Sequence, residues 1–136
     1  MCIFCKIINN EIPSKKIYED EDVLAILDIS QATKGHTLVL PKKHFSDLTE
    51  IEDYEYLKVM SVAKDLAKII KKTFNASGIN LLNNCGEVAG QTVRHFHVHI
   101  IPRYDNNDIE INFNDHSNSF DLEEIKNNIL ANIENE

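Results

Sequence analysis

The sequence contains no apolar stretch that approaches the roughly 18 residues needed to cross a bilayer. Its start, Met1-Cys2-Ile3-Phe4-Cys5-Lys6, lacks the charged head and the long apolar stretch of a signal peptide. We therefore expect a cytoplasmic protein that does not contact a membrane. Glycine and proline are scarce too, with four and three among 136 residues, whereas 43% of the residues are hydrophobic. This composition predicts one compact α/β domain.

Basic charge is also scarce. The formal net charge is −8, and residues 105–136 carry nine acidic side chains but only one lysine, Lys126, whereas residues 1–104 carry 13 acidic and 13 basic side chains. Because phosphate neutralisation supplies most of the affinity for nucleic acids, we expect no nucleic-acid binding. The composition does not exclude a local site for a small anionic ligand. The change in composition predicts a domain over residues 1–104 and an acidic, Asn-rich C-terminal extension over residues 105–136.

The cysteines are too few for a disulfide framework. There are three of them, an odd number that excludes complete pairing, and the cytosol keeps thiols reduced. Metal binding is therefore the better interpretation of Cys2 and Cys5.

Apolar spacing predicts the regular elements. Leucine, methionine, alanine and isoleucine recur at three or four residues over residues 50–74, which predicts a long helix, and Thr49 and Glu52 have the spacing of a capping box at its start. Buried strands are expected over four apolar segments: residues 23–29, 36–40, 79–84 and 93–101, the last ended by Pro102. Residues 85–91 form a loop with Gly86 and Gly90.

The extension is polar but carries some apolar side chains. Ile109, Ile111 and Phe113 alternate as in a short strand, and a helix is expected to present one apolar face, made of Phe120, Leu122, Ile125, Ile129 and Ile133. This face needs a partner surface, although so polar a segment could equally stay mobile.

The segment His95-Phe96-His97-Val98-His99 holds three of the six histidines. On a strand the three imidazoles would share one face, about 6.6 Å apart, with apolar residues on the other. A chance cluster is the weakest interpretation. All three could bind one catalytic zinc, or they could divide the work into one nucleophile, one proton or phosphate donor and one structural group.

Residues 95–101 match the signature His-φ-His-φ-His-φ-φ, with φ apolar, of the histidine triad (HIT) superfamily of nucleotide hydrolases and transferases. The resemblance extends to about Tyr104 and is closest to the bacterial-type Hint branch. It rests on further segments: Cys2-Ile3-Phe4-Cys5-Lys6-Ile7-Ile8, Ile12-Pro13, Leu27-Asp28-Ile29, Gly35-His36-Thr37-Leu38-Val39-Leu40-Pro41-Lys42-Lys43-His44, Asn84-Cys85-Gly86 and Gly90-Gln91-Thr92-Val93.

The resemblance implies roles for the histidines. His97 would attack the α-phosphorus and form a nucleotidyl-imidazole that water hydrolyses, and His99 would bind the phosphate and donate a proton to the leaving group. His36 would support the same site, although a strand-end histidine with a satisfied ring is an equally good interpretation of that residue. A covalent intermediate divides one difficult displacement into two easier steps.

The resemblance also implies a substrate pocket. Gln91 and Thr92 would contact the phosphate and leaving group, with Asn84 in the same pocket unless it only makes hydrogen bonds at the strand end. Asp28 would accept hydrogen bonds from the ribose hydroxyls, although it could be a turn residue. A purine slot would be lined by Ile3, Phe4, Ile7, Ile26 and Ile29, any of which alone would more often be core.

Cys2 and Cys5 together with His44 and His95 supply two thiolates and two imidazoles, a tetrahedral set for a structural zinc. A redox CxxC pair is the weaker alternative, because such pairs normally begin a helix inside a βαβ unit. Zinc-bearing relatives use this arrangement, including the first histidine of the triad. Cys85 is expected to be a bystander.

The resemblance implies an α+β HIT-like fold: an antiparallel sheet of about five strands with one long helix packed on it, dimerised so that two sheets become one. The expected reaction is hydrolysis of purine nucleoside phosphoramidates or related adenylyl conjugates, with no cofactor required for turnover. Alternatives are a dinucleoside polyphosphate hydrolase or nucleotidyl transferase of the same superfamily, and a non-catalytic nucleotide-binding or partner-binding module.

Overall fold

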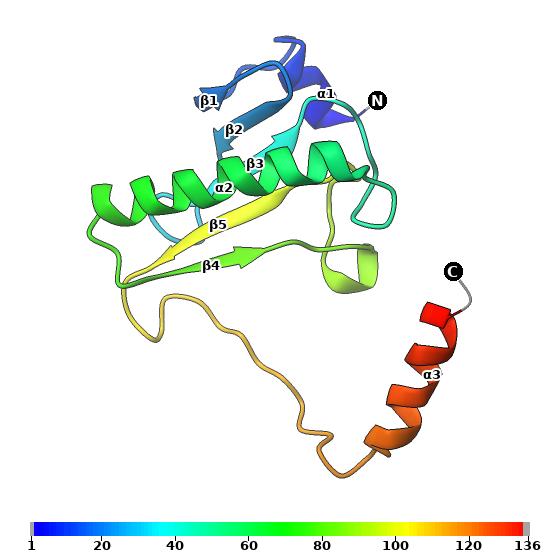
Figure 1. The fold of residues 1–136 in the computed structure, drawn as a ribbon. Helices are drawn as coiled ribbons and strands as arrows, with labels where there is room; N and C mark the ends of the chain where they lie inside the picture. Colours follow the sequence, from blue (N-terminus) through cyan, green and yellow to red (C-terminus); the bar gives the residue numbers. More distant parts are fainter. Residues whose placement is uncertain (1, 135–136) are drawn as a thin grey trace.

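Five antiparallel strands form a single sheet in the computed structural model, which describes residues 2–134 (Figure 1). The strand order is β1-β2-β3-β5-β4, so β1 and β4 are the edges. The elements along the chain are α1 (Ile3–Ile8), β1 (Lys16–Glu19), β2 (Val23–Leu27), β3 (Thr37–Pro41), α2 (Asp53–Thr73), β4 (Gly78–Leu82), the 3-10 turn η1 (Glu87–Ala89), β5 (Val98–Arg103) and α3 (Leu122–Glu134). The predicted α+β fold class is confirmed.

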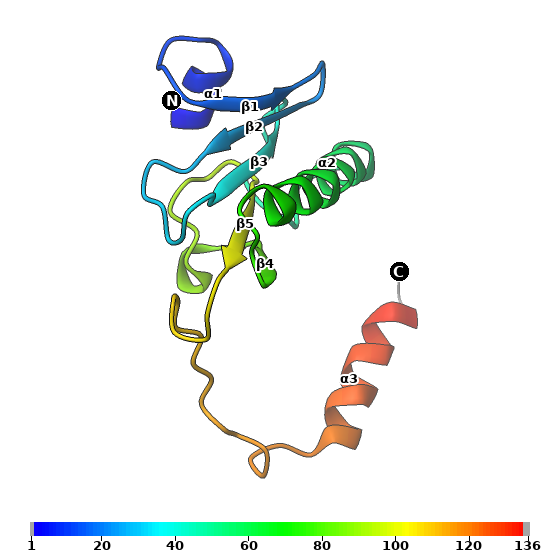
Figure 2. The same cartoon turned by 90° about the vertical axis from the view of Figure 1, so that its left-hand side faces the viewer.

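The two faces of the sheet are covered by different helices (Figure 2). Val23, Ala25 and Val39 face the long helix α2 and pack in one core cluster with its buried side chains. Leu24 and Leu38, which alternate with them, face α1 in a second cluster. Because Val98 and Ile100 of β5 belong to the α2 cluster, the alternation of a strand directs the residues between and beside them toward the α1 side.

The expected strand over residues 93–101 is wrong at both ends. β5 begins only at Val98, so His95 and His97 precede it, and it continues through Pro102 to Arg103. Pro102 fits because its carbonyl accepts a hydrogen bond from the Thr33 hydroxyl. Proline has no backbone N–H, and in a strand this group would point to the same side as the carbonyl, toward β3. The pairing of β3 with β5 ends at Ile100, so no residue of β3 needs a donor from Pro102.

The start of the long helix and one edge of the sheet also differ from expectation. Helix α2 begins at Asp53 after Glu52, which makes no side-chain cap, and Thr49 donates to Asp47 at 2.6 Å instead of capping. The edge strand β1 had not been expected, because its side chains are polar and largely exposed.

Residues 105–134 form an extended segment followed by α3, which we call the C-terminal arm. No strand forms over residues 109–113. None of the helices described in residues 2–134 combines the length and hydropathy of a membrane span. The boundary between residues 104 and 105 stays a prediction.

Candidate active site and metal centre

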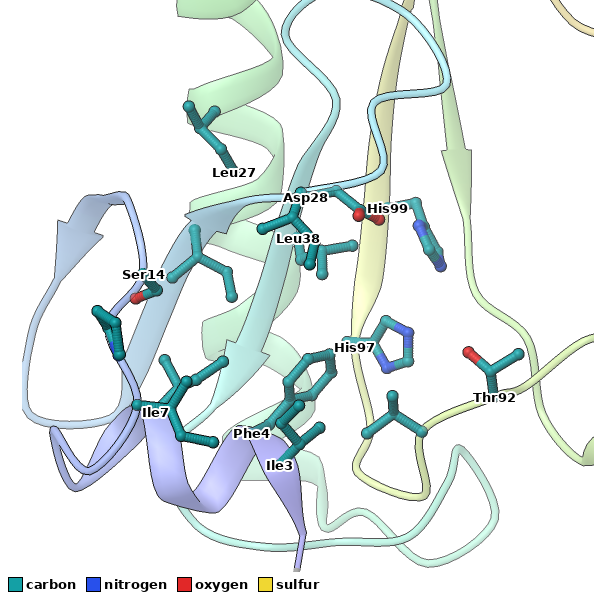
Figure 3. A pocket seen from close by; sticks show the side chains of 15 residues that line it. Ile3, Phe4, Ile7, Ser14, Leu27, Asp28, Leu38, Thr92, His97 and His99 are labelled. Carbon is teal, nitrogen blue, oxygen red and sulfur yellow. The ribbon is translucent and has the colours of Figure 1, made fainter.

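A cavity of about 280 Å³ opens on the α1 side of the sheet, a size and position suited to a small ligand. Its walls come from α1, β2, β3 and the segment that leads into β5. Figure 3 shows His97, His99 and Thr92 at one end of the cavity and Ser14 near the other. Every residue expected to form the purine slot lines it: Ile3, Phe4, Ile7, Ile26 and Ile29. Ile29 is 97% exposed and lies at the mouth.

His97 is held from two sides. Its Nδ1 lies 2.7 Å from the carbonyl oxygen of His95, so this nitrogen carries the proton and donates. The ring of Phe4 meets the imidazole edge to face, with centroids 5.0 Å apart. The unprotonated nitrogen of His97 is therefore Nε2, which is the atom left to react.

His99 lines the cavity and forms a pair with His36, which lies behind it. The backbone N–H of Ala32 donates to Nδ1 of His36 at 3.1 Å, which places the His36 proton on Nε2. That N–H donates in turn to Nδ1 of His99 at 2.9 Å. His99 therefore carries its own proton on Nε2 and can donate it to a ligand.

Burial keeps these imidazoles neutral. Desolvation lowers the pKa of His99 to about 4, with further contributions from His97 and His36, and desolvation also lowers the pKa of His97 and of His36. A neutral ring has one lone pair and one N–H. The site thus offers a nucleophile and a donor at the same time near pH 7.

The loop between β2 and β3 carries Asp28 and His36 and is held together by Gln31. The Gln31 amide oxygen accepts from the N–H groups of Gly35 and His36 at 2.8 and 3.1 Å, and its NH₂ donates to the carbonyls of Asp28 and His36 at 2.6 and 2.7 Å. Asp28 lines the cavity, and its Oδ2 lies 3.5 Å from Nε2 of His36.

The three polar candidates before β5 separate in space. Thr92 lines the cavity beside the histidines. Gln91 is 5% exposed and uses its amide on the surrounding loops, donating to Ser46 O at 2.6 Å and accepting from the Gly86 N–H at 2.9 Å. Asn84 donates to the Gly90 carbonyl at 3.4 Å. Gln91 and Asn84 are not among the residues that line the cavity.

Cys2, Cys5, His44 and His95 converge beside the cavity. Nδ1 of His95 lies 3.1 Å from Nδ1 of His44 and 3.5 and 3.6 Å from the sulfurs of Cys2 and Cys5, and the Cys5 sulfur lies 3.4 Å from Nδ1 of His44. Zn–N bonds of about 2.0 Å and Zn–S bonds of about 2.3 Å imply tetrahedral edges of about 3.3 Å for N···N and about 3.5 Å for S···N. The donor set and spacing therefore fit a zinc ion.

A second observation supports this fit. Nε2 of His95 donates to the Pro41 carbonyl at 2.8 Å, so its Nδ1 carries the lone pair that faces the two sulfurs. Among residues 2–134, the groups that could hold a metal are this cluster and Asp28, His36 and His99. The three histidines of the run do not converge on one point, so a zinc site made of all three is not supported.

Sequence reasoning missed several residues of the cavity and its support. Ser14, Leu27, Leu38 and Val93 also line the cavity. Alternation in the strand over residues 36–40 could have placed Leu38 on the α1 face. No sequence signal marks Gln31, because its four contacts depend on the loop closing around it.

Comparisons with known proteins place these features in a family. The model of the HIT domain matches residues 9–106. The chain is 50% identical over 125 residues to an uncharacterised HIT-like protein of Methanocaldococcus jannaschii, covering 92% of this chain and 95% of that protein. A crystal structure of a HIT family protein from Bacillus anthracis superposes with a TM-score of 0.90 at 51% identity, covering 98% of this chain and 95% of the other.

Two further relatives bear on metal and activity. A zinc-bound histidine triad family protein from Mycobacterium smegmatis superposes with a TM-score of 0.77 at 38% identity, covering 83% of this chain and 82% of that one. The adenylylsulfatase HINT3 of Arabidopsis thaliana is 41% identical over 102 residues, which are 75% of this chain and 52% of the plant protein.

Proposed function

The chain belongs to the HIT family, and from this membership we propose that it hydrolyses purine nucleoside phosphoramidates or related adenylyl conjugates through a covalent nucleotidyl-histidine intermediate. Its relation to the family and to an adenylylsulfatase supports the broader assignment, a nucleotide hydrolase of the HIT superfamily. The observation that carries the finer proposal is the neutral His97 ring, whose free Nε2 stands at the end of an apolar slot.

In the proposed first step, Nε2 of His97 attacks the α-phosphorus and the P–N bond to the leaving amine breaks. On binding the anionic phosphate, the His36–His99 pair takes up one proton from solvent, and His99 donates a proton from Nε2 to that amine, so that both rings end the step neutral. In the second step, water attacks the phosphorus, the bond between phosphorus and His97 breaks, and the proton released by water returns to His99. The His95 carbonyl keeps the Nδ1 proton of His97 in place throughout, which stabilises the positive ring of the intermediate.

The cavity supports a purine nucleoside as the bound part of the substrate. We propose that the base lies among the apolar side chains of α1 and β2, that Asp28 accepts from the ribose hydroxyls, and that Thr92 contacts the phosphate or leaving group. The contacts of Gln91 and Asn84 support a role in shaping the loop around the phosphate end.

We propose that Cys2, Cys5, His44 and His95 hold a structural zinc, and that turnover requires no further cofactor. A bound zinc would fix the N-terminus and the segment before β5 against each other. His95 would then link the metal centre to the nucleophile, because its ring binds the metal and its carbonyl holds His97. The free cysteines are consistent with a cytoplasmic location.

We also propose a homodimer. β4 is an edge strand whose Leu81 and Leu82 are 46% and 43% exposed, and an uncovered apolar edge favours pairing with another strand. Two copies that pair through β4 would join their sheets into one.

The test is hydrolysis of adenosine 5′-phosphoramidate and of a diadenosine polyphosphate by wild type, His97→Ala and His116→Ala, which removes an exposed histidine of the C-terminal arm. We expect the phosphoramidate to be preferred, His97→Ala to lose at least about 10³-fold in kcat, and His116→Ala to match wild type. Equal rates for wild type and His97→Ala would refute the nucleophile. Preference for the dinucleotide would favour the polyphosphate hydrolase, and nucleotide binding without turnover would favour the binding module.

A further inference from the structure

The C-terminal arm leaves the sheet in a fixed direction. At its base the guanidinium of Arg103 pairs with Asp108 and also donates to Oδ1 of Asn80 at 2.8 Å. The backbone N–H of Tyr104 donates to the same Asp108 carboxylate at 2.7 Å. These contacts tie residues 103–108 to β4, so the arm starts from an ordered turn.

Helix α3 at the end of the arm exposes its apolar stripe. Leu122, Ile125, Ile129 and Ile133 recur at helical spacing and are 77%, 40%, 55% and 60% exposed. All residues over 111–133 are exposed, and Figures 1 and 2 show α3 standing apart from the sheet and α2. A helix of 13 residues is marginally stable in water without tertiary packing. The stripe therefore requires a covering surface that its own chain does not supply.

The arm takes the same course in a solved relative. Residues 1–104 are about three quarters of the chain, yet the superposition on the Bacillus anthracis protein covers 98% of it with a TM-score of 0.90. Such a score requires most of the arm to superpose as well. The arm makes no packing contact with the rest of its own chain. Its shared course in two proteins therefore indicates that another molecule holds it.

We propose that α3 packs on a second copy of this chain, against the outer surface of that copy's α2. The arm lies beyond β4, the open edge of the sheet, and α3 lies on the same side of the sheet as α2 (Figures 1 and 2). A second sheet joined at β4 by a two-fold axis perpendicular to it carries its own α2 on that side. This inference rests on the proposed dimer but not on the proposed reaction.

Charge supports the second copy as the occupant. Lys64, Lys68 and Lys71 follow one another at helical spacing on the outer surface of α2, and Leu57 beside them is 64% exposed. The start of α3 carries Glu123 and Glu124, and the whole extension has nine acidic side chains against one lysine. An acidic helix with an apolar stripe thus faces a basic helix with an exposed leucine.

The test is hydrogen exchange and lysine cross-linking on the full chain, using a mixture of ¹⁴N- and ¹⁵N-labelled protein. We expect the α3 amides to exchange at least about tenfold slower than in an unstructured peptide. Lys126, the one lysine of the arm, should cross-link to Lys64, Lys68 or Lys71 in pairs of mixed isotope.

A matched pair of variants separates packing from charge. Ile125→Glu/Ile129→Glu should remove both the protection and the mixed cross-links. Asn127→Glu/Ala131→Glu, which adds the same charge on the opposite face of α3, should keep both. Cross-links within one isotope only would show an arm folded on its own chain, and unprotected α3 amides in a dimer would show a free arm. Either result overturns the proposal. A monomeric protein would overturn the proposed dimer with it, whereas phosphoramidate hydrolysis tests the reaction separately.

Discussion

Replacing Gly35 by alanine should destabilise the protein strongly, because this glycine meets two restrictions at once. Its φ of +98° lies in the left-handed region, which costs an L-residue about 1–2 kcal/mol. An added Cβ would lie 3.1 Å from two ring carbons of Phe74 and 3.3 Å from Cγ of Pro102. Overpacking of this kind costs about 1–3 kcal/mol. We expect a total loss of about 2–5 kcal/mol.

The measurement is urea unfolding at one fixed protein and zinc concentration, since self-association and metal both shift apparent stability. Gly78→Ala is the matched control, because an added Cβ there meets no atom within 4 Å and the φ is ordinary. That variant should stay within about 0.5 kcal/mol of wild type. A loss at Gly35 no larger than at Gly78 would refute the steric reasoning.

Three further predictions concern the site. Cys5→Ser should lower bound zinc, measured by metal analysis, and lower the melting temperature, whereas Cys85→Ser, outside the metal cluster, should change neither. Burial lowers the pKa of His99 from 6.5 to about 4, so between these values the unfolded chain binds a proton that the folded chain does not. Stability should therefore fall as the pH drops from 6.5 to 4, and His99→Gln should flatten this slope in unfolding curves; an unchanged slope would contradict the assigned burial. Gln31→Ala should lower kcat about tenfold by freeing the loop that holds His36, with zinc content unchanged; full activity would show that the loop is held without it.

Most of the residues that line the cavity could be predicted from the sequence, because the patterns that place them are local. Alternating apolar residues fix which side of a strand faces α1, and this pattern holds for Ile26 of β2 and for His99 of β5. The same reasoning failed before Val98. There the chain bends so that the His95 ring reaches the two cysteines, which lie 90 and 93 positions earlier in the sequence.

Elements without an apolar pattern could not be predicted from the sequence, for a related reason. β1 pairs along an exposed edge through its backbone, so its side chains carry no signal of the pairing. Gln31 acts through backbone groups that meet only after the loop folds. The apolar stripe of α3 was visible in the sequence, whereas the course of the arm depends on the tie between Arg103 and Asp108.

The carbonyl of His95 has a consequence for how the histidine run can vary. His97, the proposed nucleophile, takes from position 95 only a backbone oxygen, which every amino acid supplies. The imidazole at that position serves the cysteine cluster and the Pro41 carbonyl instead. If the proposed zinc is bound, selection on the side chain of His95 acts through the metal, and its substitution is expected to accompany substitution of Cys2 and Cys5. Under the proposed reaction, selection on His97 acts on the chemistry itself.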